Sequence, residues 1–288
     1  MRQLVSAKMP DKRGIIRVFD KDCRYLQQVL RLKRGDILDV RIPNGSLVSM
    51  QAVGFTKKYV ELKLVEGSSK SIERGISATL LQSKQLLSND EDIASTKIGG
   101  CEYWLFQFMT RPQKMDVIIR QAVECGVAYI VPIKGEYSPV SAEKDRSVRW
   151  NRIVKEALQQ SGSSVATQIL EPQTLEQSLE VWRKKCCECS KDVYNTNKPD
   201  LTNNCYSFIL HEDPEIQTSL FSKITVKPKK LALAVGCEGG IDAEELRKLT
   251  SFGFEKIHFN TNILRAETAS LYGISVLQFL SMEFESWK

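Results

Sequence analysis

The sequence predicts an α/β protein with two domains, a small β-rich domain at the N-terminus and a larger domain built on a parallel sheet. With 288 residues, the chain exceeds the usual size of one domain. Residues 15–65 hold several short strand patterns separated by turn signals. Further along, apolar strand patterns alternate with amphipathic helix patterns, as in sheets that helices cover on both faces.

Residues 1–70 are expected to form the small domain, with a barrel-like arrangement of strands and one helix. The helix is predicted at residues 22–33, where apolar residues recur at helical spacing, and Gly35 ends it. Pro43-Asn44-Gly45 between two alternating stretches is a strong hairpin signal. Strands are expected at residues 15–19, 37–42, 47–53 and 59–65, followed by a polar linker at 66–71.

Residues 71–288 are expected to form the second domain. One of its helices begins at Asp242, which forms a capping box with Glu245. Helices are predicted at residues 114–126, 150–160, 242–253 and 267–279, and strands at 76–83, 128–133, 207–210, 231–235 and 256–260. Residues 183–205 are polar and rich in Asn, Lys and Cys, so an exposed insertion is expected there.

Composition is typical of a globular protein. Charged residues make up 26% and hydrophobic residues 42%, and no apolar run approaches the roughly 18 residues that suggest a membrane span. Residues 1–5 do not resemble the apolar core of a signal peptide. We therefore expect a cytoplasmic protein whose eight cysteines are free thiols. The cysteine cluster at 186–189 has no second ligand pair at zinc-finger spacing, so no metal site is expected.

The positive charge is concentrated near the N-terminus. Residues 1–74 contain 16 Lys or Arg and 8 Asp or Glu, whereas the rest of the chain is slightly acidic. This asymmetry indicates a first domain that faces nucleic acid, with a solvated basic surface as the alternative.

Three predicted loops are candidate ligand sites, because ligands bind at the carboxyl ends of parallel strands. They cover residues 210–213, 236–240 and 261–268. The middle loop reads GCEGG, and three glycines exceed the need of one turn. We expect backbone that approaches a ligand closely, with a plain strand-to-helix turn as the alternative. No GxGxxG or Walker lysine motif follows a predicted strand, which argues against a dinucleotide site.

Five stretches in order resemble the RsmE family of bacterial 16S ribosomal RNA uridine-N3 methyltransferases: RYLQQVLRLKRGD, KMDVIIRQAVECGV, RWNRIVKEALQQSG, VGCEGG and NILRAETA. The resemblance covers nearly the whole chain. It implies an N-terminal PUA-like β-barrel domain that binds RNA and a C-terminal SPOUT α/β domain with a parallel sheet and a trefoil knot. It also implies a homodimer that uses S-adenosyl-L-methionine and acts on 16S ribosomal RNA of the small ribosomal subunit, in ribosome biogenesis.

The resemblance also implies which residues meet the ligands. Glu238 either offsets the positive charge of the sulfonium or holds a neighbouring loop. The expected cofactor-binding residues are Leu210, His211, Glu212, Val235, Gly236, Glu238, Gly239, Gly240, Asn260, Ile263, Leu264, Glu267 and Thr268. The expected RNA-binding residues are Arg2, Arg24, Arg31, Lys33 and Lys114.

Arg265 is the expected catalytic residue. Uridine N3 loses its proton as it attacks the methyl carbon, so the site must orient the base and stabilise negative charge on its O2 and O4. A guanidinium presents a planar fork of donors and stays charged. The alternative is an arginine that pairs with a nearby carboxylate.

Several residues depart from the family pattern. Cys237 stands in place of a proline and Ala266 in place of a threonine, while Tyr25 stands where a histidine is usual. The stretch around Tyr137 lacks the family's arginine. These changes leave open two alternatives: a non-catalytic RNA-binding or ribosome-assembly factor, and methylation of a different rRNA site.

The last predicted helix carries apolar residues beyond the stripe of roughly 100° that one core needs. The surplus is expected to meet a second subunit, with Leu277 in the interface, or else the far side of its own sheet.

Overall fold

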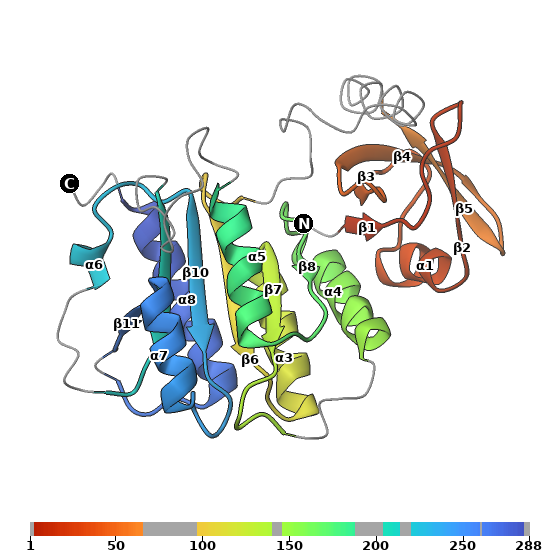
Figure 1. Ribbon diagram of the computed structural model, residues 1–288. Helices are drawn as coiled ribbons and strands as arrows, with labels where there is room; N and C mark the ends of the chain where they lie inside the picture. The colour runs from red at the N-terminus through yellow and green to blue at the C-terminus, as the bar shows by residue number, and fades with distance from the viewer. Residues whose placement is uncertain are drawn as a thin grey trace, which may run out of the picture. The chain divides into compact units, whose positions relative to one another are not determined.

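The chain divides into two compact units (Figure 1). In the computed structural model, Met1–Ser95 and Leu158–Ala166 form one unit, and Thr96–Ala157 and Thr167–Lys288 form the other. The structure describes residues 3–65, 97–139, 146–187, 204–213, 220–259 and 261–284. The predicted domain boundary at residue 70, the linker at 66–71 and the strand at 76–83 lie outside these residues.

The first unit is built on a five-stranded sheet with the order β1-β3-β4-β5-β2. All neighbours are antiparallel except β1 and β3, which run parallel. The hairpin prediction is confirmed: β3 and β4 flank the turn, and Gly45 has a φ of +85°, which glycine adopts without strain. The strands are β1 (Gln3–Val5), β2 (Ile15–Phe19), β3 (Ile37–Arg41), β4 (Leu47–Phe55) and β5 (Tyr59–Leu64).

The helix predicted at residues 22–33 is shorter than expected. It consists of α1 (Asp20–Arg24) and a π-helical turn, η1 (Tyr25–Val29). Arg31 has a φ of +52°, a left-handed conformation in which a helix cannot continue. The prediction was wrong at this end because the apolar spacing continues beyond the point where the backbone turns.

Residues 158–166 are held in the first unit by buried polar side chains. Gln3 Nε2 donates a hydrogen bond of 2.8 Å to the carbonyl oxygen of Leu158. Arg41, which is only 3% exposed, donates one of 2.7 Å to the carbonyl oxygen of Ser163. This distant stretch of chain therefore belongs to the core structure of the N-terminal unit.

The second unit confirms the predicted parallel sheet. Its six strands have the order β11-β9-β10-β6-β7-β8, and every neighbouring pair is parallel. The strands are β6 (Glu102–Phe108), β7 (Tyr129–Ile133), β8 (Gln168–Ile169), β9 (Cys205–Leu210), β10 (Lys230–Val235) and β11 (Glu255–Ile257). The helices are α3 (Pro112–Glu124), α5 (Leu175–Cys187), α6 (Leu220–Lys223), α7 (Ala243–Phe252) and α8 (Ala266–Met282), together with α4 (Ser147–Ser161), whose residues 158–161 belong to the first unit.

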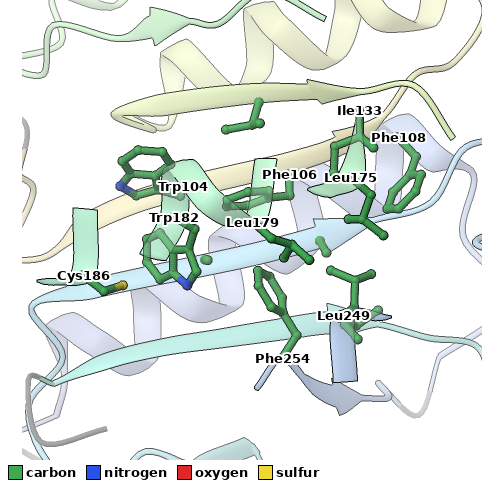
Figure 2. Packing of buried hydrophobic residues seen from close by; sticks show 14 of the residues in the cluster. Trp104, Phe106, Phe108, Ile133, Leu175, Leu179, Trp182, Cys186, Leu249 and Phe254 are labelled. Atoms are coloured by element: carbon green, nitrogen blue, oxygen red, sulfur yellow. The ribbon is translucent and has the colours of Figure 1, made fainter. Parts of the chain in front are cut away.

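Helices cover both faces of this sheet (Figure 1). On one face, α5 and α7 pack on an aromatic core that includes Trp104, Phe106 and Trp182 (Figure 2). Alternate residues of β6 point to the other face, where α3 and α8 pack against each other. Among the described helices, none has the length and apolar character needed to cross a membrane.

Three predictions in this unit need correction. β6 was not predicted, although all seven of its residues are buried, as are all six of β10, whose apolar run was predicted. The insertion was predicted from residue 183, but residues 183–187 belong to α5 and Cys186 is buried, while residues 188–203 lie outside the described residues. The strand predicted at 256–260 ends at Ile257, which lengthens the loop that follows.

The predicted start and end of α7 are confirmed. The Asp242 carboxylate accepts a hydrogen bond from the backbone N–H of Glu244, and the Glu245 carboxylate accepts one from the backbone N–H of Asp242. Gly253 ends the helix with a φ of +111°. The loop before α7 is therefore fixed at its C-terminal end.

Candidate functional site

A cavity of about 520 Å³ lies at the carboxyl ends of β9, β10 and β11. Its walls come from the three predicted loops, because the order β11-β9-β10 brings the ends of these strands together. The first turn of α3 contributes as well. The predicted residues that line the cavity are Lys114, Leu210, His211, Glu212, Val235, Gly236, Glu238, Gly239, Gly240, Ile263, Leu264 and Arg265.

The remaining predicted residues lie elsewhere. Glu267 is in the first turn of α8 and pairs with Lys114, which lines the cavity, while Thr268 is exposed and does not line the cavity. Arg24, Arg31 and Lys33 are exposed residues of the N-terminal unit. Asn260 and Arg2 lie outside the described residues.

The loop after β10, residues 236–240, folds back on itself. Gly240 donates a backbone hydrogen bond of 3.0 Å to the carbonyl oxygen of Cys237. A Cβ on Gly236 would lie 2.7 Å from the carbonyl carbon of Gly240, so glycine is required there by the loop itself. Gly240 has a φ of +82° and open space where a Cβ would be. Among the three glycines of this loop, Gly240 is therefore the one that has a positive φ and no neighbouring atom where a side chain would begin, and it lines the cavity.

A second loop supports the glycine-rich one. A Cβ on Gly239 would lie 2.9 Å from the Cβ of Tyr137, in the loop between β7 and α4. The Tyr137 hydroxyl donates a hydrogen bond of 3.3 Å to Asp242, and the backbone N–H of Glu136 donates one of 2.9 Å to Glu245. Tyr137 therefore packs against the cavity wall, although its side chain is still 51% exposed.

Gln107, on β6, fixes the start of the glycine-rich loop from behind. It is fully buried, and its Nε2 donates to the carbonyl oxygens of Val235 and Gly236 at 3.3 and 3.2 Å. Its Oε1 accepts a hydrogen bond of 2.6 Å from the hydroxyl of Ser270 on α8. A buried glutamine with both ends bonded in this way ties the loop to the last helix.

The charged groups of the cavity include a cation between two carboxylates. Lys114 Nζ lies 3.5 Å from Glu238 Oε1 and 3.3 Å from Glu267 Oε2. Burial raises the pKa of Glu267, but its own backbone N–H and the Lys114 ammonium outweigh burial, and the pKa is lowered overall. Lys114, which we predicted to contact RNA, is placed in this network.

The two histidines lie on neighbouring loops. Burial lowers the pKa of His211, and nearby Lys256 adds to the effect. His211 Nδ1 accepts a hydrogen bond of 3.2 Å from the backbone N–H of Asp213, and the ring of His258 contacts the carbonyl oxygen of His211 at 3.0 Å. This part of the wall is held by backbone contacts with a neutral His211 at pH 7.

Arg265 and Ile263 occupy the open side of the site. Arg265 is the N-cap residue of α8, with an exposed side chain, and Ile263 is 84% exposed. An exposed guanidinium beside an exposed apolar side chain suits contact with a flat, polar partner molecule.

Sequence reasoning did not assign several cavity residues. The loop after β11 begins at His258, earlier than predicted, and this brings its first residues into the wall. Gln107 was missed as well, although a single amide side chain within an apolar stretch indicates a buried group that needs hydrogen-bond partners. The unassigned lining residues are Cys237, Ile241, His258, Phe259, Thr261, Asn262, Ala266 and Ala269. Among the residues that the structure describes, none form a group of three or more His, Cys, Asp or Glu able to hold a metal ion.

Comparison with known proteins gives concordant results. Residues 100–278 match the model of a family described as RNA methyltransferase domain. The chain is 24% identical over 271 residues to ribosomal RNA small subunit methyltransferase E of Buchnera aphidicola from Acyrthosiphon pisum, covering 92% of this chain and 88% of the relative. It is 29% identical over 185 residues to the protein of that name from Aquifex aeolicus, covering 63% and 70%.

A solved structure shares the fold. Ribosomal RNA small subunit methyltransferase E from Neisseria gonorrhoeae, bound to S-adenosyl methionine, is 21% identical, with a TM-score of 0.66 and coverage of 97% of this chain and 98% of that chain. The similarity thus extends over the N-terminal unit as well as the parallel sheet.

Proposed function

The chain belongs to the RNA methyltransferase domain family, and on that premise we propose that it methylates a uridine of 16S ribosomal RNA at N3 with S-adenosylmethionine as the methyl donor. The observation that carries the proposal is the cavity at the carboxyl ends of β9, β10 and β11, lined by the GCEGG loop and the loop before α8. The relatives named ribosomal RNA small subunit methyltransferase E support the choice of RNA.

The cavity fits S-adenosylmethionine. Its volume of about 520 Å³ lies within the usual range for small-ligand sites. Leu210, Val235 and Leu264 offer apolar surface for an adenine ring, and the exposed backbone at Gly240 offers polar atoms without a side chain in the way. Glu212 supplies negative charge for a cationic ligand, whereas Glu238 pairs with Lys114.

Arg265 is the residue proposed to act on the base. The bound cofactor supplies an electrophilic methyl group, so the protein's task is to orient the uracil and favour loss of the N3 proton. The Arg265 guanidinium, on the open side of the cavity, would donate hydrogen bonds to a uracil carbonyl and stabilise the negative charge that develops there.

The N-terminal unit is proposed to bind RNA through its basic surface. Arg24, Arg31 and Lys33 are exposed, and phosphate contacts from such residues need no fixed pocket. The PUA-like character of this domain, the trefoil knot and the homodimer stay predictions of the family resemblance. So does a role for Arg2 in RNA binding and for Asn260, Glu267 and Thr268 in cofactor binding. The domain boundary at residue 70 and the cytoplasmic location stay predictions from the sequence pattern and composition.

The test is to map N3-methylated uridines in 16S ribosomal RNA from cells with and without the gene. We expect one uridine to lose its methyl group, and the purified protein with S-adenosylmethionine to restore it on RNA or small subunits from the deficient cells. The Arg265→Gln variant should restore little or none. RNA that is bound but never methylated would indicate a non-catalytic assembly factor. A methyl group found at another position of the RNA would show that the enzyme modifies a different rRNA site.

A further inference from the structure

Lys114 joins three segments that are far apart in the sequence. It lies in the first turn of α3, while Glu238 belongs to the loop after β10 and Glu267 to the first turn of α8. Its ammonium is 3.5 Å from Glu238 and 3.3 Å from Glu267. Glu238 lines the cavity, and Glu267 lies in the helix turn next to the lining residue Arg265. One cation therefore connects the 236–240 loop to the start of α8.

Partial burial makes this ion trio stronger than a surface pair. The side chains of Lys114, Glu238 and Glu267 are 29%, 27% and 21% exposed. Charges shielded from water in this way interact more strongly and are screened less by salt. Glu267 Oε2 is buried and has no hydrogen-bond partner, so the ammonium beside it supplies the nearest compensation for its charge.

Loss of the cation would set two carboxylates against each other. Both carboxylates lie within 3.5 Å of the same nitrogen, and without the cation their negative charges would repel each other. Arg265 also acts on Glu267, and the backbone N–H of Arg111 faces Glu238 at 3.5 Å, but neither bridges the two carboxylates. Lys114 thus bridges the two carboxylates, in addition to the Gln107 amide that ties the loop to α8.

We infer that Lys114 is a positioning residue of the cofactor site, whose ammonium holds the 236–240 loop and the start of α8 at the spacing that S-adenosylmethionine requires. The inference rests on the proposed function for the identity of the ligand. It gives Lys114 a role inside the site in place of the RNA contact expected from the sequence.

The test compares four variants by calorimetry with S-adenosylmethionine and by thermal unfolding without ligand, each at pH 5.5 and pH 8. Lys114→Met should lower affinity about tenfold at pH 8. The loss should be smaller at pH 5.5, because carboxylates without a shared cation take up a proton more readily as the pH falls. Adding Glu238→Gln to Lys114→Met should restore affinity at pH 8, and Lys114→Arg should stay within about threefold of wild type. Lys248→Met, which breaks the exposed pair with Glu176, is the control and should change nothing.

Thermal unfolding gives a readout that needs no cofactor. In the wild type, Glu267 has a lowered pKa in the folded state, so its contribution to stability is present at pH 8 and is lost as the pH falls through the folded pKa. In Lys114→Met, the two carboxylates have lost their shared cation, and their mutual repulsion should weaken as the pH falls, so the deficit in Tm relative to wild type should be smaller at pH 5.5 than at pH 8.

The possible results separate the two proposals. Wild-type protein that fails to bind S-adenosylmethionine overturns the proposed cofactor and this inference together. If the wild type binds, then unchanged affinity of Lys114→Met overturns the inference alone. A loss that neither pH 5.5 nor Glu238→Gln relieves also overturns it, because it reports lost packing instead of charge.

Discussion

The Ser270 hydroxyl donates a hydrogen bond of 2.6 Å to Gln107 Oε1, deep between β6 and α8, where both residues are at most 1% exposed. The other end of Gln107 donates to Val235 and Gly236. The Gln107 amide thus links the last helix to the glycine-rich loop, in addition to the Lys114 ion pairs.

Replacing Gln107 by Leu keeps the side-chain volume but removes this link. We expect a loss of about 2–3 kcal/mol in the free energy of unfolding, because the carbonyl of Gly236 loses its buried donor. Urea denaturation measures it. Ser270→Ala, which deletes only the bond to α8, should cost about 1 kcal/mol. Equal midpoints for Gln107→Leu and wild type would show that the amide contributes nothing net.

Gly236 and Gly240 should respond differently to a methyl group. Gly236→Ala places a Cβ against the backbone of Gly240, so the loop must shift and the ligand-free protein should lose thermal stability. Gly240→Ala should cost only about 1 kcal/mol of backbone strain, yet weaken S-adenosylmethionine binding about tenfold by filling cavity space.

Gly100→Ala is the matched control for Gly240→Ala. Gly100 has a φ of +83° and open space around it, but does not line the cavity. It should therefore show the strain without the loss of affinity. If Gly240→Ala binds S-adenosylmethionine like Gly100→Ala, the cofactor does not approach the backbone at Gly240.

His211 should make stability depend on pH in the acidic range. Its pKa is lowered by burial in the folded state, so the unfolded chain takes up a proton at the ordinary value near 6.5 while the folded protein does not. Stability from this source is present above pH 6.5 and declines as the pH falls toward the folded pKa.

The comparison for this prediction is His211→Asn, which keeps an acceptor for the backbone N–H of Asp213 but does not titrate. Denaturation midpoints at pH 5 and pH 7.5 should differ more for wild type than for the variant. Parallel changes in the two proteins would contradict a role for His211 in the pH response.

The dimer prediction needs a different residue from Leu277. That side chain is only 2% exposed and packs inside its own unit, so Leu277→Asp would unfold the protein. Tyr272, Phe279 and Met282 lie on one exposed face of α8, at 40%, 53% and 50% exposure. Phe279→Asp should give monomers at micromolar concentration in analytical ultracentrifugation while the Tm stays close to that of wild type.

A charge elsewhere on the unit serves as control. Val148, on α4, is 80% exposed, and Val148→Asp should leave the association unchanged. A wild-type protein that sediments as a monomer, or a Phe279→Asp protein that remains a dimer, would exclude α8 as the interface.

The parallel sheet and the three loops could be predicted from the sequence because each depends on local patterns. Alternating strands and helices indicate the sheet, and glycines after β10 indicate an unusual loop. β6 was missed although β10, which is also buried on both faces, was predicted; Glu102 and Gln107 limit the apolar run of β6 to residues 103–106. β1 is too short, at three residues, to produce a pattern.

The ion trio lies beyond such reasoning. Lys114 is separated from Glu238 and Glu267 by more than a hundred residues, and only the strand order places α3 beside the end of β10. A lysine at the start of a helix in a basic protein suggests a surface contact. Its contacts with Glu238 and Glu267 can be identified only from the packing of helices on the sheet.

The attachment of residues 158–166 to Gln3 and Arg41 bears on how the protein can be divided. A gene fragment that encodes only the N-terminal strands would lack these partners and leave a buried guanidinium with fewer acceptors. A protease that cuts between residues 65 and 97 would give two pieces that stay together. During synthesis, the N-terminal unit can be completed only after residue 166 has left the ribosome, when residues 96–157 of the second unit have already been made.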